Sequence, residues 1–264
     1  MRINCHIIDP SGNITLIVET PVPRESQSRI AAQLMQRLPE VEQVAFMQPP
    51  SYPDTDIAVR MMGGEFCGNA AVSSAALWLS ASGADIGEQR TLKLEMSGAD
   101  EPLSVDIESC GNDIYRGSVE MLLPLSCSDC GFAYGGQSFH FPVVRFPGIS
   151  HAIVTGGLTE DTAEKCIAAW CRQLGADAFG LLFVDAENSS MRPFVYVAQT
   201  DTAVWEGSCA SGTCAVAVWK AHDTGKSAFV SRSQPGGTLR ASFDGGSLVL
   251  TAQAKVLGNF SFEL

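Results

Sequence analysis

The sequence lacks any run of basic residues and any long apolar run. Among its 264 residues, 17 are Lys or Arg and 29 are Asp or Glu, a formal net charge of −12. Nucleic-acid backbones and anionic membrane surfaces are bound by clustered positive charge, so this balance argues against both. No window reaches the roughly 18 consecutive apolar residues of a membrane-spanning helix. We therefore expect neither nucleic acid nor membrane among the partners.

The first residues, Met1–His6, also lack the apolar core of a secretory signal peptide. The nine cysteines are an odd number in a chain that is not small, which excludes a fully paired disulfide framework. Thiols without an export signal are typical of a reducing compartment, so we expect a cytoplasmic protein. With 45% apolar residues the chain is expected to form a packed core, as one large or two modest domains.

Hydrophobic periodicity divides the chain into two similar halves. In each half, strand-like segments surround one amphipathic helix and one helix with almost no charge. The amphipathic helices are predicted at Ser26–Leu38 and Thr159–Leu174, and the others at Ala70–Ala81 and Thr213–Ala221. Strands are predicted at Ile14–Val18, Val44–Phe46, Ile57–Met62, Leu92–Met96, Ser104–Ile107, Val119–Leu123, Phe139–Phe146, His151–Val154, Leu181–Val184, Phe194–Ala198, Thr238–Phe243, Leu248–Ala252 and Asn259–Leu264.

The two nearly uncharged segments, Cys67–Trp78 and Cys209–Trp219, resemble each other directly. A helix without a polar face must be enclosed, and its small residues let strands approach it closely. We therefore predict an α+β fold of two pseudo-symmetric domains, residues 1–125 and 126–264. Each would be a curved, mostly antiparallel sheet wrapped around a central buried helix.

In both halves a cysteine stands just before the first turn of the buried helix: Cys67 and Cys209. The first N–H groups of a helix have no internal partner, and the helix dipole adds partial positive charge there. Both effects favour a thiolate over a thiol, which predicts lowered cysteine pKa values. The small residues that follow, Gly68 and Asn69 or Ala210 and Ser211, leave N–H groups open to a carboxylate.

Repetition of this arrangement indicates a two-base reaction. If both helix ends face one substrate carbon, a thiolate on one side removes a proton while a thiol on the other delivers one. The configuration of that carbon is then inverted without a cofactor or metal. The helix ends would hold the substrate carboxylate and stabilise the negative charge that develops.

The chain resembles the cofactor-independent, two-cysteine amino-acid racemases and epimerases of the diaminopimelate epimerase fold. The resemblance extends over nearly the whole chain in the family's order. It is carried by Gly12-Asn13, Glu42-Gln43, Cys67-Gly68-Asn69-Ala70, Gly148-Ile149-Ser150-His151, Trp205-Glu206, Cys209-Ala210-Ser211-Gly212-Thr213-Cys214 and Pro235-Gly236-Gly237. It implies that Cys67 and Cys209 are the acid/base pair. It also implies substrate contacts for the residues at the positions Asn13, Gln43, Gly68, Asn69, His151, Glu206, Ala210 and Ser211.

Departures from the diaminopimelate epimerase pattern bear on the substrate. Only Gly207 and Ser208 separate Glu206 from Cys209, where those enzymes insert an arginine that grips a distal carboxylate. Two further family asparagines are replaced by Ile149 and Ala178. The truncated loop is more similar to histidine racemases of this superfamily. We therefore expect a racemase of a free α-amino acid, histidine, acting as a monomer or homodimer.

Other interpretations stay open from the sequence. Diaminopimelate epimerase and proline-racemase-type isomerase are alternatives of the same fold, although proline racemases usually carry His where Asn69 stands. A protein that binds an amino acid without turning it over is the non-enzyme alternative. Cys127 and Cys130 form a C-x-x-C pair, but no second such pair exists, so no metal site is predicted. The sequence does not indicate which cysteine acts on the L-isomer.

Overall fold

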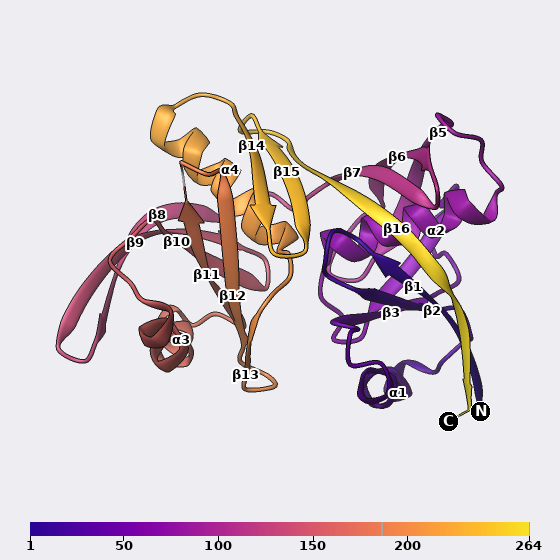
Figure 1. Ribbon diagram of the computed structural model, residues 1–264, viewed down its shortest axis with the longest axis horizontal. Coiled ribbons are helices and arrows are strands. Elements are labelled where there is room, and N and C mark those ends of the chain that lie inside the picture. The colour runs from indigo at the N-terminus through magenta and orange to yellow at the C-terminus, as the bar shows by residue number, and fades with distance from the viewer. Residues whose placement is uncertain (186, 264) are drawn as a thin grey trace. The chain divides into compact units, whose positions relative to one another are not determined.

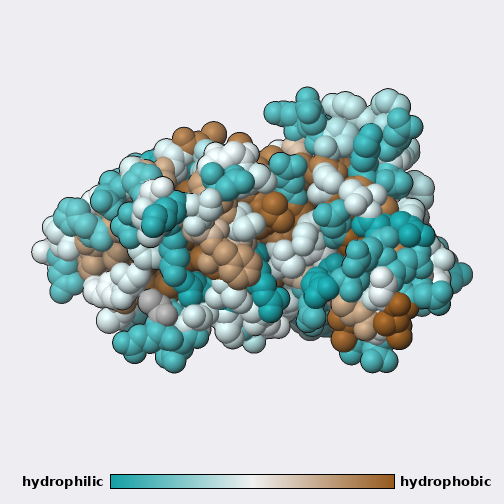
Figure 2. Space-filling view, turned by 90° about the horizontal axis from the view of Figure 1, so that it is seen from above, coloured by the Kyte–Doolittle hydropathy of each residue, from teal (hydrophilic) through white to brown (hydrophobic). Residues whose placement is uncertain are grey.

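A computed structural model describes residues 1–185 and 187–263 of the chain. It is an α+β protein with four helices and a closed eight-stranded barrel in the described residues (Figure 1). The chain forms two compact units, Met1–Glu120 with Leu250–Leu264, and Met121–Val249. None of the described helices has the length and apolarity needed to cross a membrane. On the face seen in Figure 2, hydrophobic patches are dispersed among hydrophilic residues.

The barrel belongs to the first unit. Its strands follow one another in the order β1 to β7 and then β16, and pairing of β16 with β1 closes the ring. Closure leaves the barrel no free edge strand, which protects it from edge-to-edge association. The bounds are β1 Arg2–Asp9, β2 Thr15–Val18, β3 Gln43–Met47, β4 Ile57–Met61, β5 Gln89–Met96, β6 Leu103–Gly111, β7 Ile114–Glu120 and β16 Leu248–Glu263.

Helix α2, Gly68–Ala81, is enclosed by these strands and contacts β1, β2 and β4 to β7. Its residues from Gly68 to Leu77 are all buried, as a helix without a charged face requires. Gly117 on β7 shows how closely a strand approaches, because a Cβ added there would lie 2.7 Å from a methyl group of Val72. Helix α1, Arg24–Arg37, buries only one face, with Ile30 and Leu34.

This close approach predicts that Gly117→Ala destabilises the first unit. The added methyl group must push aside Val72 and Ile107, and overpacking of this kind costs about 1–3 kcal/mol. The free energy of unfolding from urea titration measures the effect. Gly246→Ala is the control, because the nearest atom to its added Cβ is 3.8 Å away. Equal stability of the two variants would contradict the packing described for α2.

The second unit contains a mostly antiparallel sheet in the order β15-β14-β12-β11-β10-β9-β8, with β13 paired to β12. The β10–β11 and β12–β14 pairs are parallel. Helix α4, Ala210–Thr224, is buried along most of its length and contacts β8, β9, β10, β14 and β15. The bounds are β8 Ser126–Tyr134, β9 Gln137–Phe146, β10 Ile149–Val154, β11 Ala178–Asp185, β12 Ser190–Val197, β13 Thr202–Trp205, β14 Ala228–Gln234 and β15 Gly237–Phe243.

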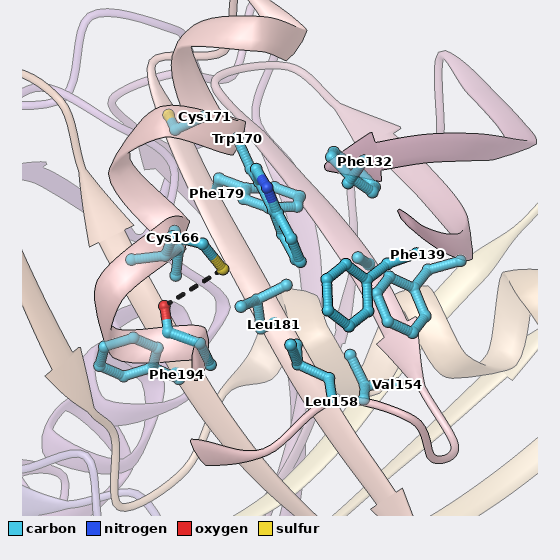
Figure 3. Close-up of a cluster of buried hydrophobic side chains, with 14 of the residues drawn as sticks. Phe132, Phe139, Val154, Leu158, Cys166, Trp170, Cys171, Phe179, Leu181 and Phe194 are labelled. Carbon is cyan, nitrogen blue, oxygen red and sulfur yellow. Dashed lines mark hydrogen bonds between the residues drawn. The ribbon is translucent and has the colours of Figure 1, made fainter. Parts of the chain in front are cut away.

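Helix α3, Glu160–Leu174, packs its apolar face on the sheet of the second unit through an aromatic cluster (Figure 3). Trp170 is 1% exposed and stacks on Phe132 with ring centroids 4.8 Å apart. Cys166 and Cys171 lie buried on the same helix and fill space as small apolar side chains. These two cysteines are therefore core residues.

All four predicted helices are confirmed, to within a few residues at their ends. The predicted strands at Leu248–Ala252 and Asn259–Leu264 are parts of one long strand, β16, and Leu264 itself lies outside the described residues. The strand predicted at Val119–Leu123 overlaps only the end of β7. Strands β1, β8, β13 and β14 were not predicted, because polar and small residues interrupt their apolar pattern.

Candidate active site

Cys67 caps helix α2 with its sulfur. The residue has extended backbone angles, φ −141° and ψ 110°, and its Sγ accepts a hydrogen bond from the N–H of Ala70 at 3.4 Å. This is the position and the contact of a helix N-cap, normally made by Ser, Thr, Asp or Asn. Half-buried Cys67 therefore stands at the helix mouth, as its sequence position predicted.

Gln43, at the start of β3, accepts a hydrogen bond from the Cys67 thiol on Oε1, with a sulfur–oxygen distance of 3.0 Å. Its Nε2 donates to the hydroxyl of Thr15 at 2.6 Å. Asn13 lies at the same end of the strands, buried, and donates from Nδ2 to the Glu42 carboxylate at 2.9 Å. The parallel pairing of Thr15 with Gln43 brings these side chains to the mouth of α2.

Gly68 and Asn69 form the first turn of α2, where backbone N–H groups have no partner within the helix. The side chain of Asn69 is buried, at 3% exposed, and its Oδ1 has no hydrogen-bond partner within the described part of the chain. An acceptor buried in this way costs free energy until a donor reaches it. In the first unit, the structure thus brings together Asn13, Gln43, Cys67, Gly68 and Asn69.

Cys209 caps helix α4 in the same manner. Its backbone is extended, φ −127° and ψ 111°, and its Sγ accepts from the N–H of Gly212 at 3.3 Å. Gln234 on β14 fixes the cap, since its Oε1 accepts from the backbone N–H of Cys209 at 2.8 Å and its Nε2 donates to Thr213. Cys209 is 6% exposed, so it is more deeply buried than Cys67.

Two side chains of the second unit, Ser211 and Glu206, approach Cys209, and a third, His151, contacts Ser211. Ser211 Oγ lies 3.6 Å from the sulfur and 2.8 Å from Nε2 of His151. His151, on β10, is fully buried, and the carboxylate of Glu206 hydrogen-bonds to the Cys209 thiol. With Ala210 in the first turn of α4, the second unit thus brings together His151, Glu206, Cys209, Ala210 and Ser211.

The pKa of the Cys209 thiol is raised, whereas the sequence predicted a lowered one. Burial, followed by the negative charge of Glu206, raises the pKa of Cys209 well above that of an ordinary thiol, although Ser211 and Gly212 hydrogen bonds act in the opposite direction. The helix N-terminus stabilises a thiolate, but removal of the sulfur from water costs more. In this structure Cys209 is therefore a thiol, able to donate a proton.

The remaining cysteines do not form a further site. Cys127 and Cys130 lie three residues apart on strand β8, so their side chains point to opposite faces. No group of three or more His, Cys, Asp or Glu side chains suited to a metal occurs among the described residues. Cys214 is buried inside α4, and burial raises the pKa of its thiol. All nine cysteines lie in the described residues, and none of them forms a disulfide.

Burial lowers the pKa of His151 to about 3, so the imidazole is neutral at physiological pH. In the unfolded chain a histidine titrates near pH 6.5, so below this pH only the unfolded state gains the proton. We expect the free energy of unfolding to fall by about 1.4 kcal/mol per pH unit from this residue alone as the pH drops from 6.5 toward 3.

The measurement is the pH dependence of urea unfolding between pH 7 and 5 for the protein and for His151→Gln. In the variant, the slope of the free energy of unfolding against pH should be smaller by about 1.4 kcal/mol per pH unit, the contribution of one proton, whatever its absolute stability. His222→Gln, at an exposed position, is the control for the loss of a histidine. An unchanged slope in His151→Gln would show that this histidine titrates normally in the folded protein.

Two supporting residues were not predicted. Thr15 and Gln234 contact the groups around Cys67 and Cys209, yet each stands in a strand where nothing in the sequence distinguishes it. Gln234 directly precedes Pro235-Gly236-Gly237, which was part of the family resemblance. Its position next to this motif was the one sequence feature that could have marked Gln234 as a site residue.

A sequence model of the family described as "Histidine racemase CntK N-terminal domain" matches residues 2–251 of the chain. A histidine racemase from Fusobacterium nucleatum is 32% identical over 216 residues, which cover 79% of this chain and 78% of the relative. A histidine racemase from Staphylococcus aureus is 23% identical over 241 residues, which cover 88% of this chain and 85% of that relative.

Among solved structures, a probable proline racemase from Agrobacterium radiobacter K84 has a similar fold. The TM-score is 0.72 at 15% sequence identity, with 99% of this chain and 93% of that chain covered. At this identity the likeness shows a common fold and no more.

Proposed function

The chain belongs to the histidine racemase family and is an amino-acid racemase, and from this premise we propose that it interconverts L- and D-histidine without a cofactor. The observation that carries the mechanism is the repeated cap. Cys67 and Cys209 each place a sulfur at the N-terminus of a buried helix, within hydrogen-bond distance of the third helical N–H. We propose that the two sulfurs serve opposite faces of one substrate α-carbon.

The catalytic step in this proposal is a pair of proton transfers. A Cys67 thiolate takes the α-proton, and the Cys209 thiol delivers its proton to the other face of the carbon. Cys209 suits the donor role, because burial and Glu206 hold it as a thiol. The N–H groups in the first turns of both helices would bind the substrate carboxylate and stabilise the enolate-like charge on it. In the reverse direction the two cysteines exchange roles.

The residues beside each sulfur support the binding of an amino acid. Asn69 Oδ1 is buried without a partner in the described residues, and the α-ammonium of the substrate would supply its missing donor. On the second unit, Ser211 connects neutral His151 to Cys209, and Glu206 accepts the thiol hydrogen bond. We assign substrate contacts to the full set predicted from sequence: Asn13, Gln43, Gly68, Asn69, His151, Glu206, Ala210 and Ser211.

We also propose the two-domain organisation of the diaminopimelate epimerase fold, with one catalytic cysteine in each domain. Near-equal cap geometry at Cys67 and Cys209 supports an internal repeat. In this proposal both thiols must stay reduced for activity, which suits the predicted cytoplasmic location. The assembly is proposed to be a monomer or a homodimer.

The test is a substrate panel with the purified, reduced protein, treated to remove pyridoxal phosphate. L-histidine, L-proline, L,L-diaminopimelate and other L-amino acids are incubated, and the D- or meso-isomer is measured by chiral chromatography. We expect turnover of histidine well above that of the others. Turnover of diaminopimelate or proline alone would refute the assignment to histidine, and binding without turnover of any amino acid would leave only the binding-protein alternative.

A further inference from the structure

Gln43 is hydrogen-bonded on both sides of its side-chain amide. Its Oε1 accepts a hydrogen bond from the Cys67 thiol at 3.0 Å, and its Nε2 donates a hydrogen bond to Oγ1 of Thr15 at 2.6 Å. Thr15 is fully buried and donates its own hydroxyl proton to the backbone carbonyl of Asn13, 3.0 Å away. Sulfur, amide and hydroxyl therefore form one chain, in which the amide and the hydroxyl can each donate or accept.

This arrangement suits a thiol but does not suit a thiolate. After Cys67 gives up its proton, the sulfur can only accept, and the amide oxygen would then face it as a second acceptor. A racemase that works in both directions passes through both states of each cysteine in turn. A partner that stabilises both states must therefore accept a hydrogen bond from the Cys67 thiol and donate one to the Cys67 thiolate.

We propose that Gln43 reverses its amide whenever Cys67 changes protonation state. A half-turn about the last side-chain bond places Nε2 against the thiolate and Oε1 against Thr15. The Thr15 hydroxyl then turns from the Asn13 carbonyl to the amide oxygen. The inference rests on the proposed function, because only a cysteine that alternates between acid and base needs such a partner.

The proton balance is simple. When Cys67 acts as acid, its S–H bond breaks, the proton forms a C–H bond with the carbanion of the substrate, and the electron pair stays on sulfur. Gln43 then turns its N–H toward that charge. When Cys67 acts as base, the sulfur pair takes the α-proton and the amide turns back. No oxidant or reductant takes part.

The two cysteines differ in this respect. Around Cys209, different groups suit the two states: the Glu206 carboxylate accepts from the thiol, while the Gly212 N–H and the Ser211 hydroxyl lie beside the sulfur. At Cys67 the Ala70 N–H donates to the sulfur as the Gly212 N–H does at Cys209, and in this proposal the Gln43 side chain serves both states of the thiol. A glutamate at position 43 would accept only, and an apolar residue would do neither, so glutamine is the residue type that the task requires.

Ionisable groups near Cys67 come from three segments. Glu42 adjoins Gln43 at the start of β3, and Glu65 lies two residues before Cys67. The guanidinium of Arg60 on β4 lies beside Gly64, where an added Cβ would be 2.7 Å from its nitrogen atoms. Helix α2 itself carries no charge. Changes confined to position 43 leave all these groups in place, so the effect of the amide on Cys67 can be measured directly.

The experiment measures alkylation of Cys67 by iodoacetamide from pH 6 to 10, resolved by peptide mass spectrometry, in the unsubstituted protein and in the Gln43→Ala and Gln43→Glu variants. The direction in which Gln43→Ala moves the pH midpoint of Cys67 alkylation distinguishes an amide that reverses from one that is fixed. If the amide reverses, it stabilises the charged thiolate more than the thiol, so its removal moves the pH midpoint upward and slows alkylation at pH 8 roughly 5- to 10-fold. Gln43→Glu should slow alkylation more strongly than Gln43→Ala does, because a carboxylate beside the sulfur opposes the thiolate.

An amide fixed with its oxygen toward sulfur stabilises only the thiol. Gln43→Ala would then lower the midpoint and speed alkylation, and that result, or an unchanged midpoint, would overturn the proposal. Gln36→Glu on the exposed face of α1 is the matched charge control and should leave the midpoint unchanged. Slow labelling of buried Cys166 and Cys171 shows that each variant is folded. Because no substrate is present, the outcome is independent of whether histidine is turned over.

Discussion

Cys67→Ala and Cys209→Ala are each expected to reduce histidine racemisation by about 10²–10⁴-fold, the usual contribution of a positioned acid or base. In the proposed mechanism either change removes one of the two groups that exchange protons with the α-carbon, so both directions of turnover should be lost together. The double variant should be about as inactive as either single variant, because the proposed mechanism uses both sulfurs in one step. The measurement is kcat/KM for L- and D-histidine by chiral chromatography.

Cys110→Ala is the matched control for these variants, since Cys110 is exposed and lies outside both helix caps. It should keep the activity of the unchanged protein. The caps themselves predict a modest loss of stability in the Cys67 and Cys209 variants, of the order of 1 kcal/mol. Full activity in either single variant would rule out a two-base mechanism that uses this pair.

Mild oxidation is expected to abolish activity almost completely and reversibly. If the two sulfurs flank one carbon, diamide can join Cys67 to Cys209, with two thiols oxidised to a disulfide and diamide reduced to the hydrazine. Dithiothreitol should then restore turnover. Peptide mapping under non-reducing conditions should find the Cys67–Cys209 linkage in proportion to the activity lost.

The oxidation test is best made in a Cys110→Ser, Cys127→Ser background, which removes an exposed thiol and half of the C-x-x-C pair. The pair itself should not compete, because its sulfurs project from opposite faces of β8. Histidine at saturating concentration should protect against the oxidant. Inactivation without a Cys67–Cys209 peptide, or a linkage that leaves activity intact, would contradict the proposed placement of the two sulfurs.

The buried helices were the part of the fold most open to prediction. All 14 residues of α2, Gly68–Ala81, are uncharged, and only an enclosed helix accommodates such a segment. The N-cap positions of Cys67 and Cys209 followed from where the two uncharged segments begin. Local sequence therefore predicted which residues stand at each helix mouth.

Pairings between distant parts of the chain could not be predicted in the same way. The last strand closes the barrel by pairing Glu263 with Arg2, a contact that no local pattern indicates. Strand β8 was missed because exposed polar residues alternate with small ones along it. Thr15 and Gln234 reach the two helix mouths only because β2 pairs with β3 and β14 packs against α4.

The charge state of Cys209 shows a second limit of sequence reasoning. The helix N-terminus is visible in the sequence and favours a thiolate. The degree of burial is not visible, and neither is the approach of Glu206, yet these two effects prevail and raise the pKa of Cys209. Which of several opposing electrostatic effects is largest depends on packing that only the folded chain defines.

The most direct test of the two-base mechanism follows the α-hydrogen during racemisation of L-histidine in D2O, before much product has formed. With two sulfurs on opposite faces, one removes the protium and the other delivers deuterium. We expect early D-histidine to carry deuterium at the α-carbon while the remaining L-histidine still carries protium. Deuterium appearing in L-histidine as fast as in D-histidine would indicate a single base, and would contradict the assignment of Cys67 and Cys209 as a pair.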